Sequence, residues 1–297
     1  MKEELILRNF KMYLRLEKSL SENSVMAYMA DLQKLTLFCE DANLLPSKLS
    51  YKDLSLFIES LADLGISPRT QARIISGIKS FYKFLVLEKV IDDNPTALIE
   101  GPRTGRKLPD VLSLDEIDSM IAAIDLSKPE GQRNKAILET LYGCGLRVSE
   151  LINLKISEIY FDEMFIRVIG KGDKQRLVPI NKRALNEIML YLRTDRVHLD
   201  IEKGHEDFVF LNRRGKQLTR VMIFTIIKNL AEMAGIHKTV SPHTFRHSFA
   251  TDLLENGANL RVIQEMLGHS SILTTEIYTH LNKETLKSTI EEFHPRK

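Results

Sequence analysis

This 297-residue sequence lacks the features that are typical of membrane proteins, secreted proteins and zinc-binding proteins. No apolar run approaches the roughly 20 residues that cross a bilayer, and the first residues lack the basic and then apolar layout of a signal peptide. Only two cysteines occur, Cys39 and Cys144, and neither has a cysteine or histidine at the spacing of metal ligands. We therefore expect a cytoplasmic protein without a membrane segment, a disulfide or a structural zinc site.

The sequence also lacks an excess of charge of one sign. Its 42 Lys and Arg against 40 Asp and Glu give a formal net charge of +2, so bulk charge does not indicate binding to nucleic acid. A DNA-binding surface would have to gather basic side chains on one face. A hydrophobic content of 43% and a charged content of 28% are typical of a globular protein, and the length suffices for two domains of about 100–200 residues each.

No internal repeat or low-complexity tract divides the chain, but one segment interrupts its helical patterns. Residues 101–110 combine two glycines and two prolines with Arg103, Arg106 and Lys107, and glycine and proline oppose a continuous helix. We interpret this segment as a basic interdomain linker. The predicted order is a first domain over 1–100, the linker over 101–110, a second domain over 111–281 and a tail helix over 282–297.

The first domain has the pattern of a bundle of about four helices. Apolar side chains recur at helical spacing in its earlier stretches, and a Ser-Pro pair at 67–68 marks the start of a further helix. That helix carries Arg69, Arg73 and Lys83 on the face opposite its apolar side chains. A solvated face is the simpler interpretation of these bases, whereas the short serine side chains between them favour close approach to DNA phosphates.

The second domain contains a single convincing β segment. β-prone runs at 164–169 and 175–180 flank a glycine-rich turn that holds Lys171, which predicts a hairpin. The turn lacks the residue order of a nucleotide-binding phosphate loop, so Lys171 either stays solvated or reaches into a DNA groove. Apart from a brief strand expected at 208–211, the rest is helical. The predicted fold class is therefore mainly α with a small β-hairpin or sheet.

A helix that begins at the Ser-Pro pair 241–242 carries the first group of chemically capable side chains. His243, Arg246 and His247 fall in its first two turns at i, i+3 and i+4, so we expect them to share one face. A cationic face at a helix N-terminus suits a phosphate. The histidine spacing also fits a metal, but a metalloprotease has glutamate where Thr244 stands, and Arg246 would repel a dication. We therefore expect no metal site.

Three further motifs hold candidate residues, and each has an ordinary structural interpretation when taken alone. Arg147 follows two glycines at the start of a helix, where Glu150 three positions later can hold its guanidinium. His269 follows Gly268, which can end a helix in the left-handed conformation and so place the histidine on a turn. Tyr278 lies on the next helix, from which its phenol can face back toward the same pocket.

Taken together, these motifs resemble the tyrosine recombinase (phage-integrase) family, and most closely its Xer branch. The resemblance covers nearly the whole chain and rests mainly on residues 241–258, 267–271 and 278–280. It implies a helical SAM-like core-binding domain that clamps DNA, followed by a tyrosine-recombinase catalytic domain. Cys144, Phe245 and Asp252 depart from the family pattern. The six functional positions that carry over are Arg147, Lys171, His243, Arg246, His269 and Tyr278.

The resemblance implies DNA strand exchange through a 3′-phosphotyrosine on Tyr278, with release of a 5′-hydroxyl. Arg147 and Arg246 would bind the non-bridging oxygens, because guanidinium matches phosphate geometry in a bidentate manner. Lys171 would protonate the leaving oxygen, and His243 would accept the phenol proton. The covalent intermediate keeps the phosphodiester energy, so neither a metal, ATP nor another cofactor is needed. His269 would add a further hydrogen-bond donor to the phosphate, and the carboxylate of Glu150 would orient Arg147.

The same resemblance implies the partners. The substrate would be a double-stranded recombination site, bound by a tetramer with or without a paralogous Xer subunit and a DNA-translocase activator. The tail helix would be exchanged between protomers, and its docking on its own domain is the alternative. The basic side chains expected to contact DNA are Arg69, Arg73, Lys83, Arg103, Arg106 and Lys107.

Two kinds of alternative remain open at this point. The short chain, without an additional N-terminal arm-binding domain, favours resolution of chromosome dimers at cell division over the integrase of a mobile element or a relaxing enzyme of the type IB topoisomerase kind. The alternative from another class is a non-enzymatic DNA-binding regulator, because residues 259–271 resemble a helix-turn-helix segment. Such a regulator would have no use for Lys171, His243 and Tyr278 together.

Overall fold

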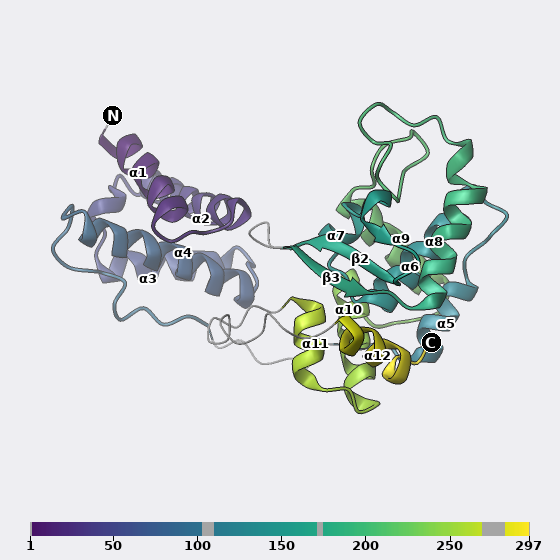
Figure 1. Cartoon of the computed structure of the whole chain (residues 1–297). Coiled ribbons are helices and arrows are strands. Elements are labelled where there is room, and N and C mark those ends of the chain that lie inside the picture. Colours follow the sequence, from purple (N-terminus) through teal and green to yellow (C-terminus); the bar gives the residue numbers. More distant parts are fainter. Residues whose placement is uncertain (1, 103–109, 171–174, 269–282, 297) are drawn as a thin grey trace. The chain divides into compact units, whose positions relative to one another are not determined.

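The computed structural model describes residues 2–102, 110–170, 175–268 and 283–296 (Figure 1). The chain forms two compact units, Met1–Lys107 and Leu108–Lys297, and the division falls inside the segment interpreted above as a linker. Within the described ranges, no helix is both long enough and apolar enough to cross a membrane.

The described part of the first unit is a bundle of four α-helices. Serine hydroxyls begin three of them, because Ser21, Ser50 and Ser67 each accept the backbone N–H three positions later. The apolar faces enclose a core that includes Phe57 and Phe81, so the helical first domain expected from the sequence is confirmed. The helices are α1 (Lys2–Leu16), α2 (Glu22–Asp41), α3 (Tyr51–Asp63) and α4 (Pro68–Leu87).

The described part of the second unit combines eight α-helices with a three-stranded antiparallel sheet. The strands are β1 (Ile159–Tyr160), β2 (Phe165–Ile169) and β3 (Gln175–Pro179), in the order β1-β2-β3. The helices are α5 (Leu114–Ala122), α6 (Gly131–Cys144), α7 (Val148–Ile152), α8 (Lys182–Thr194), α9 (Arg220–Met233), α10 (Pro242–Glu255), α11 (Leu260–Leu267) and α12 (Lys283–Phe293).

The predicted hairpin is present, whereas the other predicted strand is not. β2 pairs with β3 so that Ile169 lies opposite Gln175, and Lys171 lies in the sequence between these two residues. The strand expected at 208–211 was wrong, because Phe208 and Leu211 make only isolated bridges to Lys155 and Gln217. The short strand β1 was missed, since two residues carry too little pattern to be recognised.

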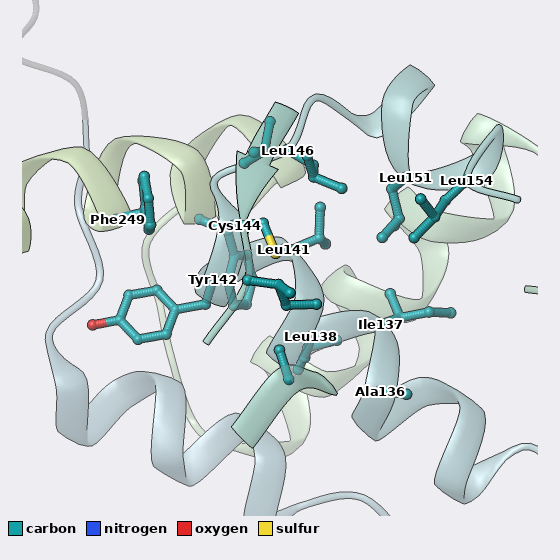
Figure 2. Packing of buried hydrophobic residues seen from close by; sticks show 14 of the residues in the cluster. Ala136, Ile137, Leu138, Leu141, Tyr142, Cys144, Leu146, Leu151, Leu154 and Phe249 are labelled. Atoms are coloured by element: carbon teal, nitrogen blue, oxygen red, sulfur yellow. The ribbon is translucent and has the colours of Figure 1, made fainter. Parts of the chain in front are cut away.

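Helix α6 carries much of the core of the second unit (Figure 2). Every residue from Ala136 to Cys144 is buried, and Cys39 in the first unit is buried as well. The helix ends at Gly145, which has a φ of +59° and where a Cβ would lie 2.5 Å from the ring of Phe249. Glycine is therefore required here both for the turn and for the packing, and Arg147 follows two residues later.

The last described segment of the chain docks on the second unit itself. Helix α12 buries Leu286 and Ile290, and His294 and Arg296 after it are buried as well. The guanidinium of Arg296 donates to Glu139 at 2.8 Å and also bonds to Asp118. The tail of this chain therefore packs in cis, through an anchor of buried charge, and its exchange between protomers stays a prediction.

His294 gives this docked tail a dependence on pH. Its Nδ1 accepts the backbone N–H of Arg296 at 3.0 Å, and its Nε2 lies 3.3 Å from the carbonyl oxygen of Tyr142, a set of partners that fits the neutral ring. Burial lowers the pKa of His294 to about 4, below the ordinary value of about 6.5. Between these values the unfolded chain binds a proton that the folded chain excludes, so stability falls as the pH falls.

We expect acidification from pH 7 to pH 5 to lower the free energy of unfolding by about 2 kcal/mol through His294 alone. Urea titrations of the full chain at both pH values measure this loss, and His294→Gln should flatten the dependence by that amount. His198, an exposed histidine of the same unit, provides the control: His198→Gln should keep the wild-type slope. Equal slopes for His294→Gln and the wild type would contradict the assignment.

Candidate active site

Arg147 is held at the start of α7 by a carboxylate one turn along the helix. Its backbone N–H donates to Glu150 Oε2 at 2.9 Å, and its Nη1 donates to Glu150 Oε1 at 2.9 Å. The predicted orienting role of Glu150 toward Arg147 therefore has a geometric basis. The side chain of Arg147 remains 37% exposed, whereas that of Glu150 is 2% exposed. The guanidinium of Arg147 is therefore partly open to solvent, although the carboxylate that holds it is buried.

Arg246 reaches the same carboxylate from α10. Ser241 caps this helix and Pro242 is its first residue, as the sequence predicts. The buried guanidinium donates to the carbonyl oxygen of Gly145 at 2.7 Å and to that of Leu267, and its Nη1 lies 4.0 Å from Glu150 Oε2. Burial, followed by repulsion from Arg147, lowers its pKa to about 9, so Arg246 stays protonated at neutral pH.

A third arginine, Arg176 on β3, completes the cluster and was missed by the sequence analysis. Its two terminal nitrogens donate to the two oxygens of Glu150 at 2.7 and 3.0 Å, and its Nε donates to the carbonyl oxygen of Met266 at 2.9 Å. A signal was present in the sequence: the alternation of a strand places Arg176 on the same face as Val178, which is buried. An arginine on a buried face needs a partner.

Burial of Glu150 alone would raise its pKa, but the arginines reverse the shift. Hydrogen bonds and charge from Arg176, together with the bonds from Arg147, hold the pKa of Glu150 below its ordinary value. The carboxylate is therefore ionised at neutral pH. With three arginines around one carboxylate, the cluster carries a net charge of +2, which suits a phosphate.

The end of α11 is the second point on which the arginines converge. The successive carbonyl oxygens of Met266, Leu267 and Gly268 accept hydrogen bonds from Arg176, Arg246 and Arg147, in that order. These carbonyls are ones that a helix leaves without an internal partner, and they carry its negative dipole end. Gly268 has a φ of +62°, and the chain passes directly from this anchored turn to position 269.

The two histidines of α10 are more accessible to solvent than Arg246. The rings of His243 and His247 stack with their centroids 4.6 Å apart and their planes at 7°. His243 is exposed and His247 is half-buried, whereas Arg246 is buried, and the expectation that all three share one face stays a prediction. Burial, and then the charges of His243 and Arg246, lower the pKa of His247, which favours its neutral form.

No metal cluster accompanies these histidines in the described part of the chain, where no group of three or more His, Cys, Asp or Glu could hold an ion. Several predicted site residues cannot be placed with them. Lys171, His269 and Tyr278 lie outside the described residues, as do the linker bases Arg103, Arg106 and Lys107.

The predicted DNA-binding bases of the first unit are exposed on α4, with one additional contact. Arg69, Arg73 and Lys83 are all exposed, but Arg73 also bonds to Asp31, a fully buried carboxylate on α2. Burial raises the pKa of Asp31, and the charge of Arg73 opposes this shift. Arg73 therefore joins α2 to α4 in addition to any contact with DNA.

Comparisons with known proteins agree over the whole chain. The models of the "Phage integrase family" and of the "Phage integrase, N-terminal SAM-like domain" match residues 110–285 and 7–89. A tyrosine recombinase XerD from Oceanobacillus iheyensis is 43% identical over 295 residues, which cover 99% of either chain. The resemblance to the Xer branch is thereby confirmed.

Solved structures lead to the same family. The crystal structure of XerA recombinase is 32% identical, with 99% of both chains covered and a TM-score of 0.51. The XerH recombinase bound to its difH substrate is 24% identical, covering 95% of this chain and 82% of that one, with a TM-score of 0.68 that shows a shared fold. The chain therefore belongs to the tyrosine recombinases of the phage integrase family.

Proposed function

We propose that this DNA strand-exchange enzyme cuts and rejoins a specific DNA site through a 3′-phosphotyrosine on Tyr278. The observation that carries the proposal is the convergence of Arg147 and Arg246 on Glu150 and on the carbonyls that end α11. These two arginines come from different helices, 99 positions apart in the sequence, yet share one carboxylate. Packing alone gives no reason to gather like charges in this way.

The arginines would act on the charge that develops as the phosphate becomes pentacoordinate. Arg147 offers its exposed side to the non-bridging oxygens, and Arg246 adds positive charge from within the protein. A charge held in a dry environment acts more strongly than one in water, and donors fixed before the reaction need no rearrangement. His269, which follows the anchored turn, would add a further donor.

Proton transfer completes the reaction. His243 is exposed near the start of α10 and would accept the phenol proton of Tyr278, because a free tyrosine with a pKa of about 10 is a poor nucleophile at neutral pH. Lys171, in the segment of sequence that joins β2 to β3, would protonate the leaving 5′-oxygen. A 5′-hydroxyl from a partner strand then attacks the phosphotyrosine, which reverses the same two proton transfers.

DNA is the partner that the relatives support, since XerH has been solved with its difH substrate. The residues proposed to contact the phosphates of the site are Arg69, Arg73, Lys83, Arg103, Arg106 and Lys107. In this proposal the core-binding domain covers residues 1–100 and the linker covers 101–110. The catalytic domain covers 111–281 and the tail helix covers 282–297. Because phosphate contacts release counterions, the affinity should fall steeply with salt.

The relatives named XerD support an Xer role for the chain. We propose that it resolves chromosome dimers at cell division in the cytoplasm. It would act as a tetramer on two duplexes, alone or with a paralogous recombinase, and under a DNA-translocase activator. The tail that docks in cis in this single chain would move to a neighbouring protomer on assembly.

The test is to trap the covalent intermediate on a nicked duplex. Duplexes selected by the protein from a random-sequence pool are nicked next to candidate scissile phosphates and incubated with chelator and without ATP. We expect a protein–DNA adduct that survives denaturant and leaves a free 5′-hydroxyl that can be labelled by a kinase. Tight binding without any adduct, also after a paralogue is added, would contradict the proposal and favour a regulator.

A further inference from the structure

We propose that Arg176 is a positioning residue for DNA cleavage. It links β3, which follows Lys171 in the sequence, to the end of α11, which precedes His269, and it offsets the charge of Glu150. This inference rests on the proposed function. Arg176 is placed to do so because one guanidinium spans Glu150 and the carbonyl oxygen of Met266. Its side chain is only 16% exposed, so it acts on the reaction through its neighbours and not by contact with the DNA.

The first effect of Arg176 is mechanical. It follows Gln175, which pairs with Ile169 across the hairpin that carries Lys171. At its other end, the bond to Met266 fixes the last turn of α11, and Gly268 packs so closely that a Cβ there would lie 3.1 Å from the guanidinium. One side chain therefore sets the distance between the segments that lead to the general acid and to a phosphate donor.

The second effect is electrostatic. Each oxygen of Glu150 accepts one hydrogen bond from Arg176. Arg176 therefore offsets the negative charge of Glu150, which would otherwise reduce the positive charge of Arg147 and Arg246. Loss of Arg176 would lower the net charge of the cluster from +2 to +1. A phosphodiester carries one negative charge, and its pentacoordinate state carries about two. The missing charge would therefore weaken binding of the transition state more than binding of the substrate.

Arg176→Gln should slow single-turnover cleavage of the nicked duplex by about 10²-fold, while DNA affinity changes by less than about threefold. Arg176→Lys keeps the charge but reaches fewer partners, and we expect a loss of about tenfold. The double variant Glu150→Gln with Arg176→Gln restores the net charge of +2 and should cleave about tenfold faster than Arg176→Gln. A merely structural residue would give a double variant worse than either single one.

Arg167 supplies a matched control on the same sheet. It lies on β2 and also holds a carboxylate with two nitrogens, that of Glu158, but it has no contact with Glu150 among the described interactions. Arg167→Gln should cleave at the wild-type rate. If Arg176→Gln does not fold, as thermal unfolding will show, Arg176→Lys carries the test.

Two results would overturn the role of Arg176 alone: cleavage by Arg176→Gln within threefold of the wild type, or a double variant no faster than Arg176→Gln. Both are read against a wild-type chain that forms the adduct, so they leave the proposed function intact. Absence of the adduct in the wild type would instead overturn the proposed function, and the inference with it.

Discussion

Tyr278→Phe should form no covalent adduct on a nicked duplex that traps the wild type, and should bind that duplex with unchanged affinity. Phenylalanine keeps the ring but removes the oxygen that is proposed to attack the phosphate, and phenylalanine has no other group that could form this linkage. The adduct is measured on a denaturing gel, and affinity is measured by titration of the intact duplex. The expected loss is complete, because the first chemical step has no substitute.

The other tyrosines of the second unit support this assignment by their surroundings. The hydroxyl of Tyr142 donates to Asp252, and burial raises its pKa far above the ordinary value. Tyr191 is buried, which raises its pKa, and its hydroxyl accepts from the backbone of Leu211. Neither phenol can ionise readily or reach a duplex.

Tyr160 is the matched control for this experiment, because it is the exposed tyrosine among the described residues of the second unit. Tyr160→Phe should form the adduct at the wild-type rate. An adduct that persists in Tyr278→Phe and disappears in Tyr160→Phe would show that the nucleophile has been assigned to the wrong tyrosine.

Local signals explain how closely the elements could be predicted. The remainder of the second domain was expected to be helical, and helices are found there at Lys182–Thr194, Pro242–Glu255 and Leu260–Leu267. Their N-caps are Asn181, Ser241 and Asn259, whose side chains accept a backbone N–H of the first turn. The start of each helix can therefore be predicted from a single residue. The hairpin was found for the same reason, since β-prone runs and glycines lie next to each other in the sequence.

The parts that could not be predicted depend on contacts between distant segments. Arg176 bonds to Glu150 and to Met266, 26 and 90 positions away. The sequence of its own strand does not indicate which residues these partners are. The anchor of the tail is similar, because Arg296 and its partner Glu139 lie 157 positions apart in the sequence. The chemistry of the arginines was accessible from the sequence, but the carbonyls that orient them were not.

Arg246→Gln should slow cleavage by roughly 10³-fold, because it removes a preorganised positive charge from the site. It also leaves the carbonyl oxygens of Gly145 and Leu267 without their donor, at about 1–3 kcal/mol for each buried acceptor. Single-turnover rates on saturating duplex separate the chemical defect from binding, and thermal unfolding reports the loss of stability. A variant that cleaves within tenfold of the wild type would contradict the role of Arg246 in the transition state.

Arg246→Lys separates charge from geometry at the same position. Lysine keeps the positive charge, but a single ammonium cannot reach the carbonyls of Gly145 and Leu267 together and still face the phosphate. We therefore expect Arg246→Lys to remain about 10²-fold slower than the wild type, although its DNA affinity and salt dependence stay the same. If Arg246→Lys cleaves as fast as the wild type, charge alone is sufficient, and the two carbonyl bonds serve the fold and not the reaction.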